Sequence, residues 1–163
     1  MQELLRTAYR LSVDSPDPST QNAAFLTDKW GWITHTAVNE FPRGVSYSEE
    51  RWLRPIKYAY IEHAERNCLF RAAAAGLCTA GMTMVCPWAA CADCARAIIQ
   101  CGIVRLIRNA DQSRGTHPRW GDSISVADVM LQEAGVDIID VEMLGGQFLD
   151  LDPIRRDGKL WQP

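Results

Sequence analysis

Residues 61–70 read IEHAERNCLF, and this stretch places His63 and Glu65 two residues apart where a helical pattern begins. A second helical pattern further along the chain carries Cys91 and Cys94, three residues apart, in its opening turn. Imidazole and thiolate groups are the ligands that zinc prefers, so these two helix starts would form a metal site if the fold brought them together. The order of the neighbouring elements bears on that question.

The segments around this stretch alternate between helical and strand patterns. An amphipathic helix comes first, two short apolar runs then form a hairpin, and helices and strands alternate afterwards. Such an order predicts an α/β fold, a three-layer α/β/α sandwich with a mixed central sheet whose later strands are parallel. We expect helices over 2–12, 62–75, 91–102 and 123–135, the last capped by Ser123 or Ser125, and strands over 22–27, 31–38, 82–86, 103–108 and 136–143.

Three segments show no clear periodicity. Residues 46–60 mix aromatic, basic and acidic side chains around a proline, which predicts a loop with one helical turn. Residues 111–123, DQSRGTHPRWGDS, are expected to form a long loop after a strand. The C-terminal segment 150–163 is interpreted as a packed extension or an oligomer contact, with Arg155 and Arg156 in solvent.

Composition limits the classes of function. At 163 residues the chain fits a single domain, which we expect to cover residues 1–163. A formal net charge of −3 disfavours nucleic acid as a partner, and no apolar run is long enough to cross a membrane. The N-terminus lacks the order of a secretory signal, so we expect a cytoplasmic protein. In that compartment the six cysteines indicate metal binding or thiolate chemistry rather than disulfides.

The expected sheet brings the metal-binding side chains to one edge. If both helices begin there, His63, Cys91 and Cys94 meet where ligand sites of such folds gather. Three nitrogen and sulfur ligands with a fourth position open to water describe a catalytic zinc site. Glu65 is then free to act as a proton shuttle, which takes a proton from the bound water and passes it to a ring nitrogen and to departing ammonia.

Two other interpretations of the cysteine motif stay open. C-x-x-C at a helix start is also typical of a redox pair. A purely structural zinc site would need a fourth ligand, which Cys86, Cys68 or His35 would have to provide. The pairing of His63 with Glu65 is better explained by the catalytic site, which we therefore favour.

Basic side chains in the segment 111–123 are candidates for binding an anionic substrate. Arg114, His117 and Arg119 lie together there, and the planar fork of arginine matches two phosphate oxygens at once. A solvated loop or a subunit contact explains the same residues equally well. Arg43 is a further basic candidate, for the triphosphate of an effector.

The motifs of the expected metal site resemble the zinc-dependent cytidine deaminase superfamily. Its signature is H-x-E followed by P-C-x-x-C, which HAE at 63–65 and CADC at 91–94 match, with Ala90 in place of the proline. Within the superfamily the chain looks most like the deoxycytidylate (dCMP) deaminases. Residues 17–25, DPSTQNAAF, resemble their D-P-S-T-Q opening, and residues 37–44, AVNEFPRG, resemble their G-Y-N-G-x-P-x-G loop.

This resemblance implies hydrolytic conversion of dCMP to dUMP and ammonia, with the zinc ligands and the proton shuttle named above, and a supply of dUMP for thymidylate synthesis. It implies that Asn39 contacts the deoxyribose or the nucleotide and that Ala64 lies at the base pocket. It also implies a homohexamer with an effector site that includes Asn39 and Arg43. There dCTP, with Mg²⁺, activates the enzyme and dTTP inhibits it.

Other proteins share the H-x-E arrangement, so alternatives remain. Deaminases of guanine, of tRNA adenosine and of a riboflavin-pathway pyrimidine use the same chemistry on other bases. The acidic composition disfavours the tRNA enzyme, because binding of RNA requires a basic surface. The alternative outside enzymes is a non-catalytic module that zinc stabilises.

Overall fold

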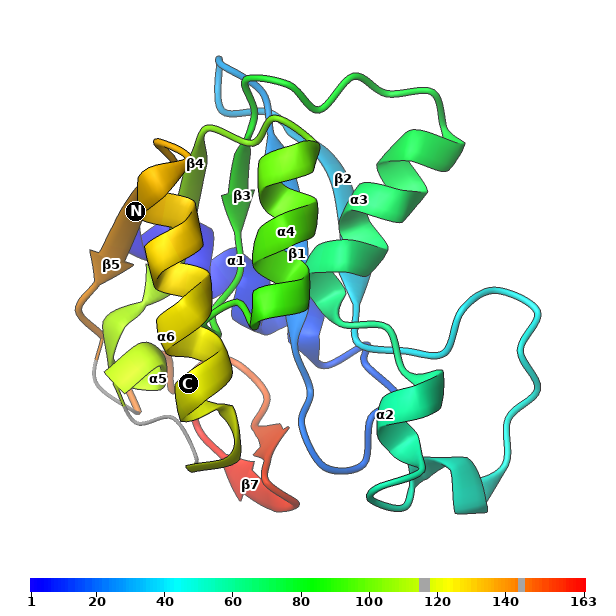
Figure 1. Ribbon diagram of the computed structural model, residues 1–163. Coiled ribbons are helices and arrows are strands. Elements are labelled where there is room, and N and C mark those ends of the chain that lie inside the picture. Colours follow the sequence, from blue (N-terminus) through cyan, green and yellow to red (C-terminus); the bar gives the residue numbers. More distant parts are fainter. Residues whose placement is uncertain (115–117, 144–145) are drawn as a thin grey trace.

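The computed structural model describes residues 1–114, 118–143 and 146–163, and it has a five-stranded sheet at its centre (Figure 1). The strands are β1 (Ala23–Thr27), β2 (Ile33–Val38), β3 (Thr83–Val85), β4 (Arg105–Asn109) and β5 (Asp137–Val141), in the order β2-β1-β3-β4-β5. Strand β1 is antiparallel to both of its neighbours, whereas β3, β4 and β5 are parallel. The expected mixed sheet with parallel later strands is confirmed.

Helices cover both faces of this sheet (Figure 1). One face carries α3 (Ala64–Ala74), α4 (Ala92–Gln100) and α6 (Pro118–Glu133), and the other carries α1 (Gln2–Ser12). The three-layer arrangement is therefore also confirmed. Within the described parts of the chain, no helix combines the length and the apolar character that a membrane span requires.

The core follows from the alternation of side chains along the strands. Successive residues of a strand point to opposite faces of the sheet. In β3, Met84 belongs to the core beneath α3, α4 and α6, whereas Val85 belongs to the core beneath α1. Both side chains are fully buried. The central strands are thus apolar on both faces, as a sheet between two helical layers requires.

The C-terminal segment forms a hairpin of β6 (Ile154–Arg156) and β7 (Lys159–Trp161). Its fully buried Ile154 belongs to the core beneath α1, and the ring of Trp161 lies 5.5 Å from the ring of Tyr9. The segment is therefore a packed extension, which was one of the two expected possibilities. Asp157, at the turn of the hairpin, has a φ of +48°, a conformation that Asp and Asn tolerate better than most residues.

The predicted loops contain more helix than expected. Residues 46–60 hold two short turns, η1 (Glu49–Trp52) and α2 (Lys57–Tyr60), instead of one. Ser48 caps the first of them by accepting a hydrogen bond from the N–H of Arg51. A single capped turn has too few residues to produce the periodic pattern by which longer helices are found.

The prediction of one long loop over 111–123 is wrong. Helix α5 (Ala110–Arg114) follows β4 directly, and α6 begins at Pro118. The side chain of Asn109 caps α5, because its Oδ1 accepts a hydrogen bond from the N–H of Asp111. Proline suits the first turn of a helix, where its missing N–H leaves no intrahelical bond unmade.

The two serines expected to cap the last helix instead lie inside α6. Ser123 Oγ accepts a hydrogen bond from the N–H of Ala92 at the start of α4, over 3.0 Å. Ser125 Oγ donates to the carbonyl of Gly121 within its own helix. Ser123 therefore stabilises the beginning of the neighbouring helix, which carries the cysteines.

Candidate active site

The two helices that carry the predicted metal ligands begin beside each other. His63 is the N-cap residue of α3 and Cys91 is the N-cap residue of α4, both with extended backbone conformations. Cys94 lies in the first turn of α4. Because both helices pack on one face of the sheet with their N-termini at the same edge, the imidazole and the two thiols come together.

The spacing of these ligand atoms fits zinc. His63 Nδ1 lies 3.6 Å from the sulfur of Cys91 and 3.6 Å from that of Cys94, and the two sulfurs lie 3.5 Å apart. Zinc bonds nitrogen at about 2.0–2.1 Å and sulfur at about 2.3 Å, so its tetrahedral ligands lie roughly 3.5–3.8 Å from one another. In the part of the chain that the structure describes, no fourth His, Cys, Asp or Glu joins the group. A zinc ion held by these three residues would therefore keep one coordination position for water or substrate.

The candidate fourth ligands of a structural zinc site lie elsewhere. Cys68 and Cys86 are buried and belong to the core beneath α3 and α4. The Sγ of Cys68 donates to the backbone carbonyl of His35, and burial raises the pKa of this thiol to about 12. These groups are not within reach of the cluster, which disfavours the four-ligand structural site.

The cluster favours a thiolate at neutral pH. A hydrogen bond with Cys94 is the largest influence on Cys91, and together with His63 it lowers the pKa of Cys91 to about 4, despite burial. Burial opposes the charged form of His63, but the hydrogen bond with Cys91 and the charge of Glu65 raise its pKa overall. Partial positive charge at the starts of α3 and α4 further favours the thiolate form of Cys91. The donors are thus electronically suited to a divalent cation.

Glu65 lies in the first turn of α3, next to the cluster and almost completely buried. Burial raises the pKa of its carboxyl group, and the positive charge of His63 opposes that shift. A carboxyl group with a raised pKa takes up a proton more readily than an ordinary carboxylate does. Glu65 also lines a cavity, so this group can reach a bound ligand.

The cavity opens beside the cluster and has aromatic walls. Trp120 lies edge-on to the His63 ring, with the ring centroids 5.6 Å apart. Tyr58 packs edge-on against Trp120, at 5.7 Å. Both aromatic residues line the cavity together with Trp88 and Glu65. Such walls suit a flat heterocycle and exclude water from it.

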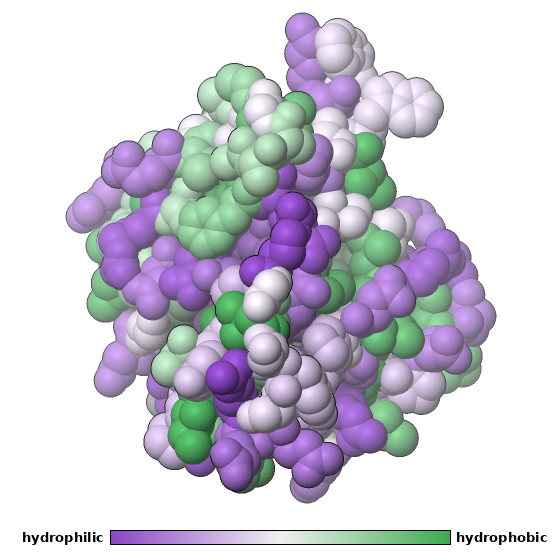
Figure 2. Space-filling model, turned by 90° about the vertical axis from the view of Figure 1, so that its right-hand side faces the viewer, coloured by the Kyte–Doolittle hydropathy of each residue, from purple (hydrophilic) through white to green (hydrophobic). Residues whose placement is uncertain are grey.

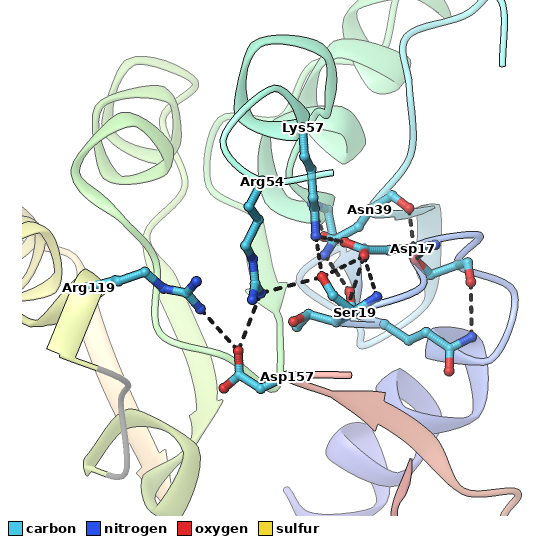
Figure 3. Close-up of polar contacts among 11 residues, drawn as sticks. Asp17, Ser19, Asn39, Arg54, Lys57, Arg119 and Asp157 are labelled. Carbon is cyan, nitrogen blue, oxygen red and sulfur yellow. Dashed lines mark hydrogen bonds and ion pairs between the residues drawn. The ribbon is translucent and has the colours of Figure 1, made fainter. Parts of the chain in front are cut away.

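Charged side chains line the same cavity, and Figure 3 shows how they pair. Lys57 Nζ donates to Asp17 Oδ2 over 2.5 Å and to Ser19 Oγ over 2.7 Å, and the Lys57 and Asp17 side chains are almost fully buried. Asp157 accepts hydrogen bonds from Arg54 at 3.3 Å and from Arg119 at 3.1 Å (Figure 3). Lys57 is therefore neutralised by its partner, whereas one carboxylate serves two arginines.

Arg156 supplies a further positive charge to the cavity. Its guanidinium lies over the ring of Trp88, 5.2 Å from the centroid, and near the ring of Trp161. Among the residues that the structure describes, no carboxylate lies within ion-pair distance of Arg156. A cation held against aromatic faces without a carboxylate partner is well placed to bind an anionic group of a ligand.

The residues expected to bind substrate fall in different places. Asn39 lines the cavity, where its Oδ1 accepts a hydrogen bond from the N–H of Ala64. Arg119 contacts the cavity only indirectly, through its bond to Asp157, and Arg43 is exposed outside the cavity lining. Ala64, expected at the base pocket, is fully buried and is not among the residues that line the cavity. The side chain of Arg114 and all of His117 lie outside the described residues.

The sequence interpretation missed three cationic residues of the cavity. Arg54 and Lys57 lie shortly before the H-x-E motif, in a segment read as a loop, and their closeness to His63 along the chain was the signal that could have identified them. Arg156 was expected to be solvated, and this expectation is wrong. No local pattern identifies Arg156, because its position depends on how the C-terminal hairpin folds back.

Comparison with known proteins identifies the family. Residues 1–110 match the family model described as the cytidine and deoxycytidylate deaminase zinc-binding region. The chain belongs to this family. An uncharacterised deaminase from the luxG 3′ region of Aliivibrio fischeri is 37% identical over 125 residues, which are 76% of this chain and 81% of that protein.

Two other similar proteins have names that state their substrate. Human deoxycytidylate deaminase is 27% identical over 138 residues, which are 81% of this chain and 74% of the human protein. A dCMP deaminase from the cyanophage S-TIM5, solved in complex with dCMP and dUMP, superposes with a TM-score of 0.66 at 24% identity. That match covers 87% of this chain and 95% of the phage chain, and it shows that the two share a deaminase fold.

Proposed function

We propose that this deaminase hydrolyses dCMP to dUMP and ammonia. The observation that carries the proposal is that one cavity holds both the zinc-type cluster with Glu65 and the guanidinium groups of Arg54 and Arg156. A cytosine ring at the cluster and a phosphate at the arginines are the two ends of a pyrimidine nucleotide. The names of the human and phage relatives are consistent with this substrate.

The cluster and its neighbour account for the reaction type. Zinc, when held by His63, Cys91 and Cys94, would activate a water molecule so that the water acts as the nucleophile. The Glu65 carboxylate accepts a proton from the attacking water, protonates N3 of the cytosine and transfers a proton to the departing amino group. Water is consumed and ammonia leaves, so the balance is that of a hydrolysis and requires no redox partner.

The walls of the cavity orient the base for this attack. The Trp120 ring lies 5.6 Å from the His63 ring, so a base that lies against Trp120 is held next to the cluster. Tyr58 packs against Trp120 in a T-shaped contact and so helps to hold the Trp120 ring in place. The aromatic surface also excludes bulk water, which strengthens the electrostatic interactions of Glu65 with the substrate.

The arginines account for a nucleotide rather than a nucleoside as the substrate. Arg156 has no carboxylate partner among the described residues, and Arg54 shares Asp157 with Arg119. A phosphate bound there replaces a shared carboxylate with a group that offers three acceptor oxygens. Arg114, His117 and Arg119 remain further candidates for the phosphate, as the sequence indicated.

A panel of substrates tests the proposal. Zinc-loaded protein is incubated with dCMP, deoxycytidine, CMP, guanine and adenosine, and ammonia release is measured. We expect dCMP to have the highest kcat/KM of the panel. Release from guanine or adenosine but not from dCMP would contradict the proposal. So would a folded, zinc-containing protein that releases ammonia from none of them, because that result describes a non-catalytic module.

The family resemblance extends the proposal to assembly and regulation. We propose a cytoplasmic homohexamer that dCTP with Mg²⁺ activates and dTTP inhibits, with Asn39 and Arg43 at the effector site. An apolar patch in Figure 2, on the side where the outer surface of α3 exposes Phe70, Ala73 and Ala74, supports a subunit contact there. Sedimentation with and without each nucleotide tests the assembly, and an unchanged monomer would contradict it.

A further inference from the structure

Asn22 is a buried amide at the wall of the cavity with one end unpaired. It immediately precedes β1, is 4% exposed and lines the cavity. Its Nδ2 donates a hydrogen bond to the sulfur of Cys86, over 3.2 Å. Its Oδ1 is buried and has no hydrogen-bond partner among the described residues. The amide is thus anchored at its nitrogen and offers an acceptor on the other side.

Trp88 provides a second unpaired polar atom in the same cavity. Its indole Nε1 is buried without a partner in the described part of the chain. The backbone N–H of Trp88 and the amide of Asn22 both donate to Cys86, so one sulfur holds these two residues together. Native proteins leave few buried polar atoms unpaired, and two in one cavity point to a ligand that pairs with them.

The position of these atoms matches the middle of a nucleotide. Trp88 lies three residues before Cys91 of the metal cluster, and its ring carries the Arg156 guanidinium. If the base lies at the cluster and the phosphate at Arg156, the sugar lies along this wall. A hydroxyl group can donate to one atom and accept from another, as an unpaired acceptor and an unpaired N–H require.

Asn39, the residue expected to contact the sugar, is already bonded at both ends of its amide. Its Nδ2 donates to the carbonyl of Thr20, and its Oδ1 accepts from Ala64 N–H, each over 3.0 Å. The backbone of Asn39 also donates to the carbonyl of Asn22. Asn39 therefore holds the start of α3 next to the residues that precede β1. The unpaired acceptor in this part of the cavity belongs to Asn22.

We propose that Asn22 determines specificity for the sugar by accepting a hydrogen bond from the 3′-hydroxyl of the bound deoxynucleotide. This inference rests on the proposed function. In dCMP only the 4-amino group and the 3′-hydroxyl donate hydrogen bonds when the phosphate is ionised, and the amino group leaves at the metal cluster. The 3′-hydroxyl is therefore the donor that Asn22 recognises, with Trp88 beside it.

The test compares dCMP with 2′,3′-dideoxycytidine 5′-monophosphate, which lacks only the 3′-hydroxyl. For the wild-type enzyme we expect kcat/KM to fall roughly tenfold with the dideoxy substrate, the effect of one hydrogen bond between neutral groups. In Asn22→Leu, kcat/KM for dCMP falls by a similar factor. The preference for dCMP over the dideoxy substrate is then smaller in this variant than in the wild type, because only the Trp88 N–H remains to pair with the hydroxyl. Gln132→Leu, at an exposed amide of α6, is the matched control and retains the wild-type ratio.

Several outcomes separate the possibilities. A variant that loses activity equally on both substrates, and so keeps the wild-type ratio, would show a structural role for Asn22 and overturn the inference. If Asn22→Leu does not fold, the wild type decides, because equal kcat/KM for the two substrates also overturns it. Calorimetry with dUMP and its 2′,3′-dideoxy analogue gives a readout besides turnover. Absence of dCMP turnover would contradict the proposed function. Equal affinity for dUMP and its 2′,3′-dideoxy analogue would contradict the role of Asn22.

Discussion

His63, Cys91 and Cys94 occupy the first positions of two helices, where backbone N–H groups have no carbonyl partner within the helix and partial positive charge favours anions. Their chemistry therefore depends on helix geometry as well as on residue type. Glu65 follows within the first turn of α3, and its burial distinguishes it from an ordinary surface carboxylate. At the residue scale, the residues proposed to hold the metal and the residue proposed to transfer protons are therefore different.

The lowered pKa of Cys91, about 4, leads to a prediction about the metal-free protein. After zinc is removed by a chelator, Cys91 stays a thiolate from pH 6 to pH 8, so its alkylation rate by iodoacetamide stays nearly constant. N-acetylcysteine has an ordinary thiol pKa, so its own alkylation rate rises about tenfold with each pH unit over this range. Mass spectrometry of the labelled peptide measures the rate, and circular dichroism checks that the fold is kept. A rate at Cys91 that rises like that of N-acetylcysteine would contradict the prediction.

Arg156 leads to a prediction about substrate choice. Arg156→Gln is expected to raise KM for dCMP roughly 10- to 100-fold, because a hydrogen bond to a charged group contributes about 1.5–3 kcal/mol. KM for deoxycytidine, which has no phosphate, stays unchanged. Steady-state kinetics on both substrates measure the difference, with Arg155→Gln, at the exposed neighbouring residue, as the control. An equal effect of Arg156→Gln on both substrates would argue against phosphate binding.

At the scale of elements, the sequence predicted the helices and strands that have strong periodicity. The starts of α3 and α4 were predictable because a metal motif and a helical pattern coincide there. Helix α5 and the first turns of α6 were missed because turn-forming residues dominate 111–123. The cap from Ser123 to Ala92 joins two helices far apart in the chain, so no local pattern indicates it.

That contact gives a prediction about helix α4. Ser123→Ala removes the acceptor of the Ala92 N–H and is expected to lower the free energy of unfolding by about 1 kcal/mol, as the loss of an N-cap does. Ser125→Ala, two residues along the same helix, removes only an exposed hydrogen bond to Gly121. It should change the free energy of unfolding by less than about 0.5 kcal/mol. Urea unfolding of both variants measures the difference. Equal effects would mean that the contact between the helices adds no stability.

On the scale of the whole molecule, the C-terminal hairpin completes both a core and the cavity. Ile154 is fully buried beneath α1, and Arg156, two residues later, lines the cavity. The sequence could predict that this tail packs, since it contains apolar residues, but not where. Its position depends on contacts with residues far away in the chain, such as Tyr9, and these are not encoded in any local periodicity.

The docking of the hairpin can be tested through its buried residue. Ile154→Ala is expected to lower the free energy of unfolding by about 2–5 kcal/mol, because it removes a buried side chain and leaves a cavity. Leu160→Ala, on the other strand of the hairpin with a side chain that is 68% exposed, should have little effect. Urea unfolding compares the two variants. Equal stability of the two variants would show that the hairpin is not packed as described.

The most direct test of the central claim measures zinc content and ammonia release from dCMP for the wild type and for Glu65→Gln. The account predicts one zinc ion per chain in both proteins, because Glu65 is not a ligand, together with ammonia release by the wild type. It predicts that the variant loses at least about a hundredfold in kcat, the usual contribution of a proton-transfer group. Undiminished ammonia release by the variant, or none by a folded, zinc-containing wild type, would contradict it.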